Sequence, residues 1–68
     1  MIPNPTLREH IRARAENRPG VYRMYGPGDE LLYVGKSVHV RTRLLSYFRA
    51  TKGEKAWELI SAASHVSW

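Results

Sequence analysis

The sequence contains no cysteine, and its apolar runs are short. Without cysteine, the chain has no disulfide framework, no zinc-thiolate site and no thiol nucleophile. The longest uninterrupted aliphatic and aromatic run, residues 31–34, is far below the roughly 20 residues of a membrane span. The segment from Met1 to Asn4 lacks both the charged and the apolar region of a signal peptide. These absences predict a soluble protein of the cytoplasm without a membrane partner.

Acidic residues are also scarce, since 6 Asp and Glu stand against 11 Lys and Arg and give a net charge of +5. The block of residues 36–55 alone supplies this excess, because its only acidic residue is Glu54. A local excess of positive charge favours a polyanionic partner such as a nucleic acid. The alternative is a solvated helix face in a protein that is simply basic, and charge alone leaves both interpretations open.

The first half of the chain predicts a helix followed by a β-hairpin. Thr6 and Glu9 have the spacing of a capping box, so we expect a helix with Thr6 as its N-cap that ends near Asn17. Two runs rich in β-forming residues, 20–25 and 31–35, flank a turn of glycine, proline and aspartate. This arrangement is typical of an antiparallel hairpin.

The second half predicts two more helices and a strand. Ser37 is placed to cap a helix over residues 38–50, in which apolar residues recur at helical spacing. A further helix is expected over 54–63, and residues 65–68 alternate like the start of a strand. So short a chain accommodates one core, and we therefore expect a single α/β (α+β) domain over residues 1–68.

Several kinds of site have no support in the sequence. The three histidines, His10, His39 and His65, are scattered and have no second ligand at metal-binding spacing. The glycine-rich turn lacks the pattern of a phosphate loop, and no serine has the context of a nucleophile elbow. Among these residue types, the sequence predicts neither a metal centre nor a serine nucleophile.

One group of tyrosines and cations remains. Tyr22 and Tyr33 lie on the two hairpin strands, Lys36 follows the second strand, and Arg43 and Tyr47 are four residues apart on the next helix. If these side chains converge, they suit phosphodiester cleavage, because a guanidinium stabilises charge on phosphate oxygens and a phenol orients water or accepts a proton. Ordinary strand tyrosines beside an arginine that covers the core are the alternative.

The order and spacing of these residues resemble the signature of the GIY-YIG nuclease family. The matching segments are Gly20-Val21-Tyr22, Tyr33-Val34-Gly35-Lys36 and the helical pair Arg43 and Tyr47. The resemblance extends over residues 7–68 and is greatest to the repair branch, the N-terminal incision domains of excinuclease nucleases.

The resemblance implies a small three-stranded antiparallel sheet flanked by helices, and hydrolysis of DNA in nucleotide excision repair with a divalent metal, Mg²⁺ or Mn²⁺. Tyr22 and Tyr33 would be the paired active-site tyrosines, and Arg43 the arginine that stabilises the transition state. Substrate-binding candidates are Lys36, Tyr47, Arg41 and Arg49. DNA and other excision-repair proteins are the expected partners.

The family binds its metal through a glutamate on a helix after the third strand. We expect that ligand to lie beyond Trp68 and the chain to be the front portion of the domain, since Glu54 and Glu58 precede the strand. Two alternatives stay open: a basic DNA-binding module without activity, and a GIY-YIG nuclease of the homing or restriction branch.

Overall fold

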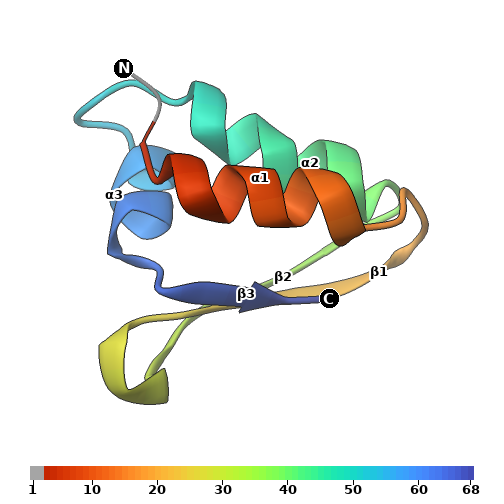
Figure 1. Cartoon of the computed structure of the whole chain (residues 1–68), viewed down its shortest axis with the longest axis horizontal. Helices are drawn as coiled ribbons and strands as arrows, with labels where there is room; N and C mark the ends of the chain where they lie inside the picture. The colour runs from red at the N-terminus through yellow and green to blue at the C-terminus, as the bar shows by residue number, and fades with distance from the viewer. Residues whose placement is uncertain (1–2) are drawn as a thin grey trace.

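The computed structural model describes residues 3–68, which form helices and a three-stranded antiparallel sheet (Figure 1). The predicted α+β class is confirmed. No helix within residues 3–68 has the length and apolar character needed to cross a membrane. The elements in chain order are α1 (Pro5–Arg14), β1 (Gly20–Tyr25), the 3₁₀ helix η1 (Pro27–Asp29), β2 (Leu31–Ser37), α2 (Val40–Ser46), the 3₁₀ helix η2 (Tyr47–Arg49), α3 (Lys55–Ala62) and β3 (His65–Ser67).

The sheet has the strand order β2-β1-β3, and β1 pairs antiparallel with both neighbours. The register places Tyr22 opposite Gly35 and Met24 opposite Tyr33. Since side chains alternate between the two faces of a strand, these four positions share one face. Tyr22 and Met24 are buried there, whereas Val21 on the other face is exposed. The predicted hairpin is confirmed, and the face that carries Tyr22 and Tyr33 is the one directed at the core.

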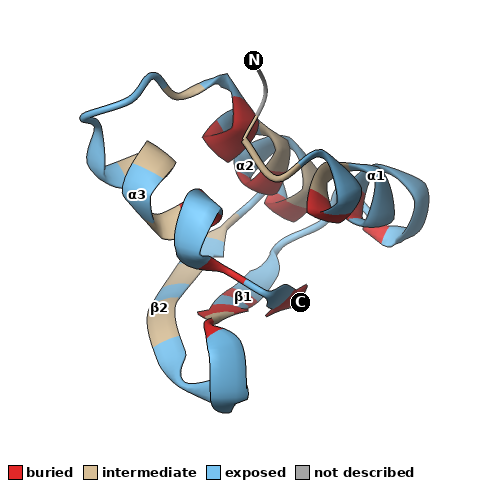
Figure 2. Cartoon of the chain, turned by 60° about the vertical axis from the view of Figure 1, so that its left-hand side comes forward, coloured by how far each residue is buried: buried red, intermediate tan, exposed pale blue. Residues whose placement is uncertain are grey.

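All three α-helices lie on the same side of the sheet (Figure 1). Helices α1 and α2 pack against each other, and α2 also contacts both strands of the hairpin. Buried residues gather on the facing sides of α1 and α2 and along β1 (Figure 2). The hydrophobic core consists of Leu7, Ile11, Ala15, Tyr22, Met24, Val40, Leu44, Tyr47, Phe48, Ile60, Ala63 and Val66. Two tyrosines of the predicted site therefore belong to the core.

Helix α1 begins earlier than the capping box predicts, and Thr6 as its N-cap is wrong. The N-cap is Asn4, which has a left-handed backbone with φ of 51°, and Pro5 occupies the first helical position. The Asn4 amide nitrogen donates to the carbonyl oxygens of Ile60 (3.0 Å) and Ala63 (2.8 Å). Asn4 thus connects the start of α1 to the end of α3, a long-range contact that outweighs the local capping pattern.

Helix α2 is shorter than the predicted range 38–50 at both ends, and β2 continues to Ser37. Ser37 is not the N-cap, although its hydroxyl accepts a hydrogen bond from the His39 N–H (3.0 Å). The helix begins at Val40, and residues 47–49 tighten into η2. Arg43 and Tyr47 still lie one turn apart, so the spacing on which the predicted site depends is retained.

Candidate functional site

Tyr22 lies at the centre of the site, where its ring covers Gly35 of the neighbouring strand. The side chain is only 1% exposed. A Cβ atom at Gly35 would lie 2.5 Å from both Cζ and the hydroxyl oxygen of Tyr22. No side chain fits between this ring and strand β2, so the glycine directly opposite Tyr22 is what allows the ring to lie flat against the sheet.

The hydroxyl of Tyr22 connects the sheet to α2. Its oxygen lies 2.9 Å from the Tyr47 hydroxyl oxygen, and the two groups share a buried hydrogen bond. Arg43 donates from Nε to the same Tyr22 oxygen at 3.4 Å. The Arg43 guanidinium carbon also lies 5.4 Å from the centre of the Tyr47 ring, a cation–π distance. Tyr22 and Tyr47 together therefore fix the position of the arginine.

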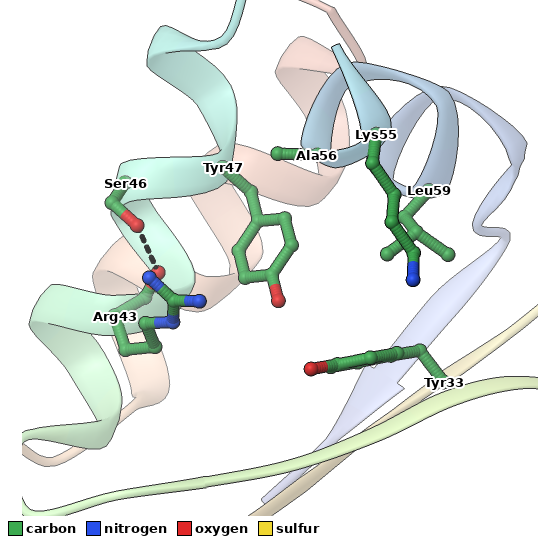
Figure 3. Close-up of a pocket in the computed structure, with 7 residues that line it drawn as sticks. All are labelled: Tyr33, Arg43, Ser46, Tyr47, Lys55, Ala56 and Leu59. Atoms are coloured by element: carbon green, nitrogen blue, oxygen red, sulfur yellow. Dashed lines mark hydrogen bonds between the residues drawn. The ribbon is translucent and has the colours of Figure 1, made fainter.

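A pocket of about 200 Å³ opens beside this cluster (Figure 3). Its floor is the ring of Tyr33, which is partly exposed and lies 6.2 Å from the Tyr22 ring. Figure 3 shows the Tyr33 hydroxyl pointing toward the side of the pocket where Arg43 lies. The lining residues are Tyr33, Arg43, Ser46, Tyr47, Lys55, Ala56 and Leu59. Tyr22 is not among them, so it acts on the pocket through Arg43 and Tyr47.

The electrostatics of the cluster favour the protonated forms of Arg43 and Tyr47. Burial raises the pKa of Tyr47, and the hydrogen bond to Tyr22 adds to this effect. The hydrogen bond from Arg43 to Tyr22 raises the arginine's pKa, and the nearby phenols act in the same direction. At neutral pH the pocket therefore presents a guanidinium cation and a neutral phenol, whose hydroxyl shares a hydrogen bond with that of Tyr22.

Three of the candidate substrate-binding residues lie outside the pocket. Lys36, which directly follows Gly35 on β2, is exposed. It borders a separate hollow that Val38 also lines. Arg41 donates from Nη2 to the backbone oxygen of Arg12 on α1 at 3.3 Å. Arg49 is exposed on η2. The structure brings together Tyr22, Tyr33, Arg43 and Tyr47, but not these three.

Sequence reasoning missed the second cation of the pocket, Lys55. It is the first residue of α3, and its ammonium nitrogen lies 6.0 Å from the centre of the Tyr33 ring. No local signal marks it: Lys55 and Leu59 are four residues apart and so lie on one side of α3, but only the structure shows that this side borders the pocket. The packing of α3 against η2 brings this lysine close to Tyr33.

The residues present do not fit a divalent metal ion. Mg²⁺ and Mn²⁺ prefer carboxylate and other oxygen ligands. No carboxylate lines the pocket, and residues 3–68 contain no group of three or more His, Asp or Glu side chains that could hold an ion. Glu54 hydrogen-bonds to Thr51 through the backbone N–H (2.6 Å) and the hydroxyl (2.9 Å), which lowers the Glu54 pKa. The pocket offers phenols and cations.

Removing the hydroxyl of Tyr22 is expected to destabilise the protein by about 1–2 kcal/mol, because Tyr47 and Arg43 both lose their buried partner. A double-mutant cycle of Tyr22→Phe and Tyr47→Phe, measured by urea unfolding, should show strong non-additivity. Tyr25→Phe on the same strand is the control, since no hydrogen bond of its hydroxyl is seen within residues 3–68. Additive effects would contradict the shared hydrogen bond.

Comparison with known proteins identifies close relatives. The chain is 43% identical over 53 residues to the UvrABC system protein C of Haemophilus influenzae, a match that covers 78% of this chain and 9% of the relative. The protein of the same name from Acinetobacter baylyi is 42% identical over 65 residues, covering 91% of this chain and 11% of the relative. The protein of the same name from Pseudarthrobacter chlorophenolicus is 37% identical over 69 residues, covering 98% of this chain and 10% of the relative.

The chain thus spans about a tenth of the length of these relatives. No solved structure gives a significant match. A family model described as the UvrC-like GIY-YIG domain matches residues 18–68, which include the whole hairpin, α2, α3 and every residue that lines the pocket. On this match and these relatives, the chain belongs to the UvrC-like GIY-YIG domain family.

Proposed function

We propose that this chain is a nuclease domain that hydrolyses a phosphodiester bond of DNA in nucleotide excision repair. The observation that carries the proposal is the arginine held by two tyrosines at the edge of a pocket that a third tyrosine floors. Membership of the UvrC-like GIY-YIG family supports it. Because the relatives are named as components of the UvrABC system, we also infer DNA and other excision-repair proteins as partners, in the cytoplasm.

Arg43 is suited to bind the scissile phosphate. Its Nε is bonded to Tyr22, whereas its two terminal nitrogens make no hydrogen bond to another residue within the described range 3–68. A guanidinium presents its terminal N–H groups as a planar fork that matches two phosphate oxygens. Since negative charge accumulates on those oxygens during attack at phosphorus, a cation already held in place stabilises the transition state more than the ground state.

The tyrosines divide the remaining tasks. Tyr47 is protonated at neutral pH, so its hydroxyl donates to a phosphate oxygen or to the Tyr22 oxygen and does not act as a base. Tyr33 reaches the pocket from the opposite side, and we assign it the orientation of the attacking water. In the reaction the water oxygen bonds to phosphorus, the P–O bond to the leaving nucleotide breaks, and the water's proton passes to solvent or to the leaving oxygen.

Chemistry that a bound divalent metal supplies, namely charge neutralisation at the phosphate and activation of the leaving oxygen, is expected of this family. The described residues offer it no carboxylate. The same observation supports a second candidate function, a basic module that binds DNA without cutting it. Activity and binding must therefore be measured separately.

A chimera tests the proposal directly. Residues 1–68 replace the matched segment of the Pseudarthrobacter chlorophenolicus relative, whose alignment covers 98% of this chain. The chimera is assayed for nicking of damaged plasmid DNA with Mg²⁺ or Mn²⁺ and with the other components of the UvrABC system. We expect damage-dependent nicking that disappears without a divalent ion.

A matched chimera with Arg23→Ala controls for the loss of a positive charge, because Arg23 is exposed on the sheet face opposite the pocket. It should nick like the parent chimera. A folded chimera that binds DNA and does not nick under any of these conditions would replace the nuclease proposal with the DNA-binding module.

A further inference from the structure

We propose that Lys55 supplies a second positive contact to the phosphodiester, from the wall of the pocket opposite Arg43. The inference rests on the proposed function and assigns to α3 a part of the substrate site that the signature residues do not include. It describes the ligand as a phosphate diester bridged by two cations that come from different helices, α2 and α3.

The geometry brings the two cations to one cavity. Arg43 stands beside the ring of Tyr47 at 5.4 Å, and Lys55 stands beside the ring of Tyr33 at 6.0 Å. Figure 3 shows the ammonium of Lys55 directed down toward Tyr33, while Arg43 occupies the far side beyond Tyr47. Each cation is thus paired with an aromatic wall, and the space of about 200 Å³ between them is open to a small anion.

The charge of Lys55 is available for a ligand. No carboxylate lies within 4 Å of its ammonium among residues 3–68, where the ion pairs involve other cations. Its neighbour Glu54 is engaged by the backbone N–H and hydroxyl of Thr51. An ammonium beside an aromatic face still has N–H donors directed elsewhere, so a phosphate oxygen is a suitable further partner.

The same Thr51 bonds fix the start of α3. Glu54 is the residue that precedes the helix, and its carboxylate closes the turn from Thr51. Ala56, in the first turn of α3, and Leu59, one turn after Lys55, pack against the core. Lys55 therefore projects from a helix end that is held at both its cap and its apolar face, which places its side chain over the pocket.

The two cations have different tasks. Arg43 is held at Nε by Tyr22 and has its two terminal nitrogens free of other partners within residues 3–68 for two phosphate oxygens, which suits charge that develops in the transition state. Lys55 is a flexible point charge, which neutralises phosphate equally in the ground state and the transition state. Uniform binding of this kind affects KM and leaves kcat nearly unchanged. Lys55 is therefore a substrate-binding residue, distinct in its kinetic effect from Arg43.

The test compares Lys55→Gln with Lys52→Gln, a control that removes the same charge from the exposed loop before α3. In the full chain, binding to a short DNA duplex is measured as a function of salt. For Lys55→Gln, we expect about tenfold weaker binding and a salt slope smaller by about 0.9, the value of one phosphate contact. In the chimera, KM should rise about tenfold with kcat nearly unchanged, and Lys55→Arg should restore KM.

Equal salt slopes and equal KM values for Lys55→Gln and Lys52→Gln would overturn the inference. So would a loss of binding that Lys55→Arg fails to restore, since a change in helix stability would then account for it. Failure of the proposed function has a different result: the chimera would bind DNA without nicking it, and the salt slopes of Lys55→Gln and Lys52→Gln would still differ if Lys55 contacts phosphate.

Discussion

Alanine in place of Arg43 is expected to lower the rate of DNA cleavage in the chimera by about 10²–10³-fold or more. The loss of one preorganised donor to a transition-state oxyanion has effects of this size. Arg43 offers more than one donor, because both terminal nitrogens of its guanidinium can donate to phosphate oxygens. The guanidinium is also positioned before substrate binds, between the Tyr22 hydroxyl and the Tyr47 ring. Single-turnover kinetics of the chimera measures the rate of the cleavage step itself. Binding to duplex DNA should weaken only about tenfold, as expected for one phosphate contact.

Arg43→Lys distinguishes geometry from charge. Lysine keeps the positive charge but has neither the planar fork nor the Nε that bonds to Tyr22, so cleavage should remain low while binding recovers. Arg23→Ala on the opposite sheet face should leave both measurements unchanged. Parallel losses in cleavage and binding for Arg43→Ala would contradict a transition-state role and would assign Arg43 to simple phosphate binding.

The strand pattern and the helical spacing are sufficient to predict which tyrosines meet. Tyr22 and Tyr33 fall on one face of the sheet because the hairpin turn fixes the register. Arg43 on α2 and Tyr47 at the start of η2 fall on one side of the helical segment because they are four residues apart. Both relations depend on residues close in sequence, so they can be predicted from the sequence alone. The two pairs come together once α2 packs on the hairpin.

Which lysine lines the pocket could not be predicted from such local relations. Lys36 belongs to a matching segment of the signature, but it follows Gly35, and alternation along β2 takes its side chain away from the face that carries Tyr33. Lys55 is 22 positions after Tyr33 in the sequence, and only the return of α3 across the end of α2 brings it to the pocket. The position of Asn4 as N-cap could not be predicted for the same reason, since its partners Ile60 and Ala63 are distant in sequence.

A single methyl group at Gly35 is expected to destabilise the protein by about 1–3 kcal/mol and to abolish cleavage together with it. The backbone at Gly35 is not left-handed, so alanine meets no conformational penalty there. The cost is steric, because the new Cβ would lie 2.5 Å from Cζ and the hydroxyl oxygen of Tyr22. The ring must move, and its movement breaks the bonds that hold Arg43 and Tyr47.

Gly20→Ala is the matched control in the same hairpin. There an added Cβ would meet only Cγ2 of Val40 at 3.4 Å, an ordinary contact, and urea unfolding should show little change. A second variant locates the clash: in a Tyr22→Leu background the shorter side chain leaves room, so Gly35→Ala should cost far less than in the parent. An equal cost in both backgrounds would show that Gly35 is required for a reason other than the Tyr22 ring. The dependence on Tyr22 would mean that one glycine, which makes no contact with Arg43 itself, determines through the Tyr22 ring where Arg43 is held.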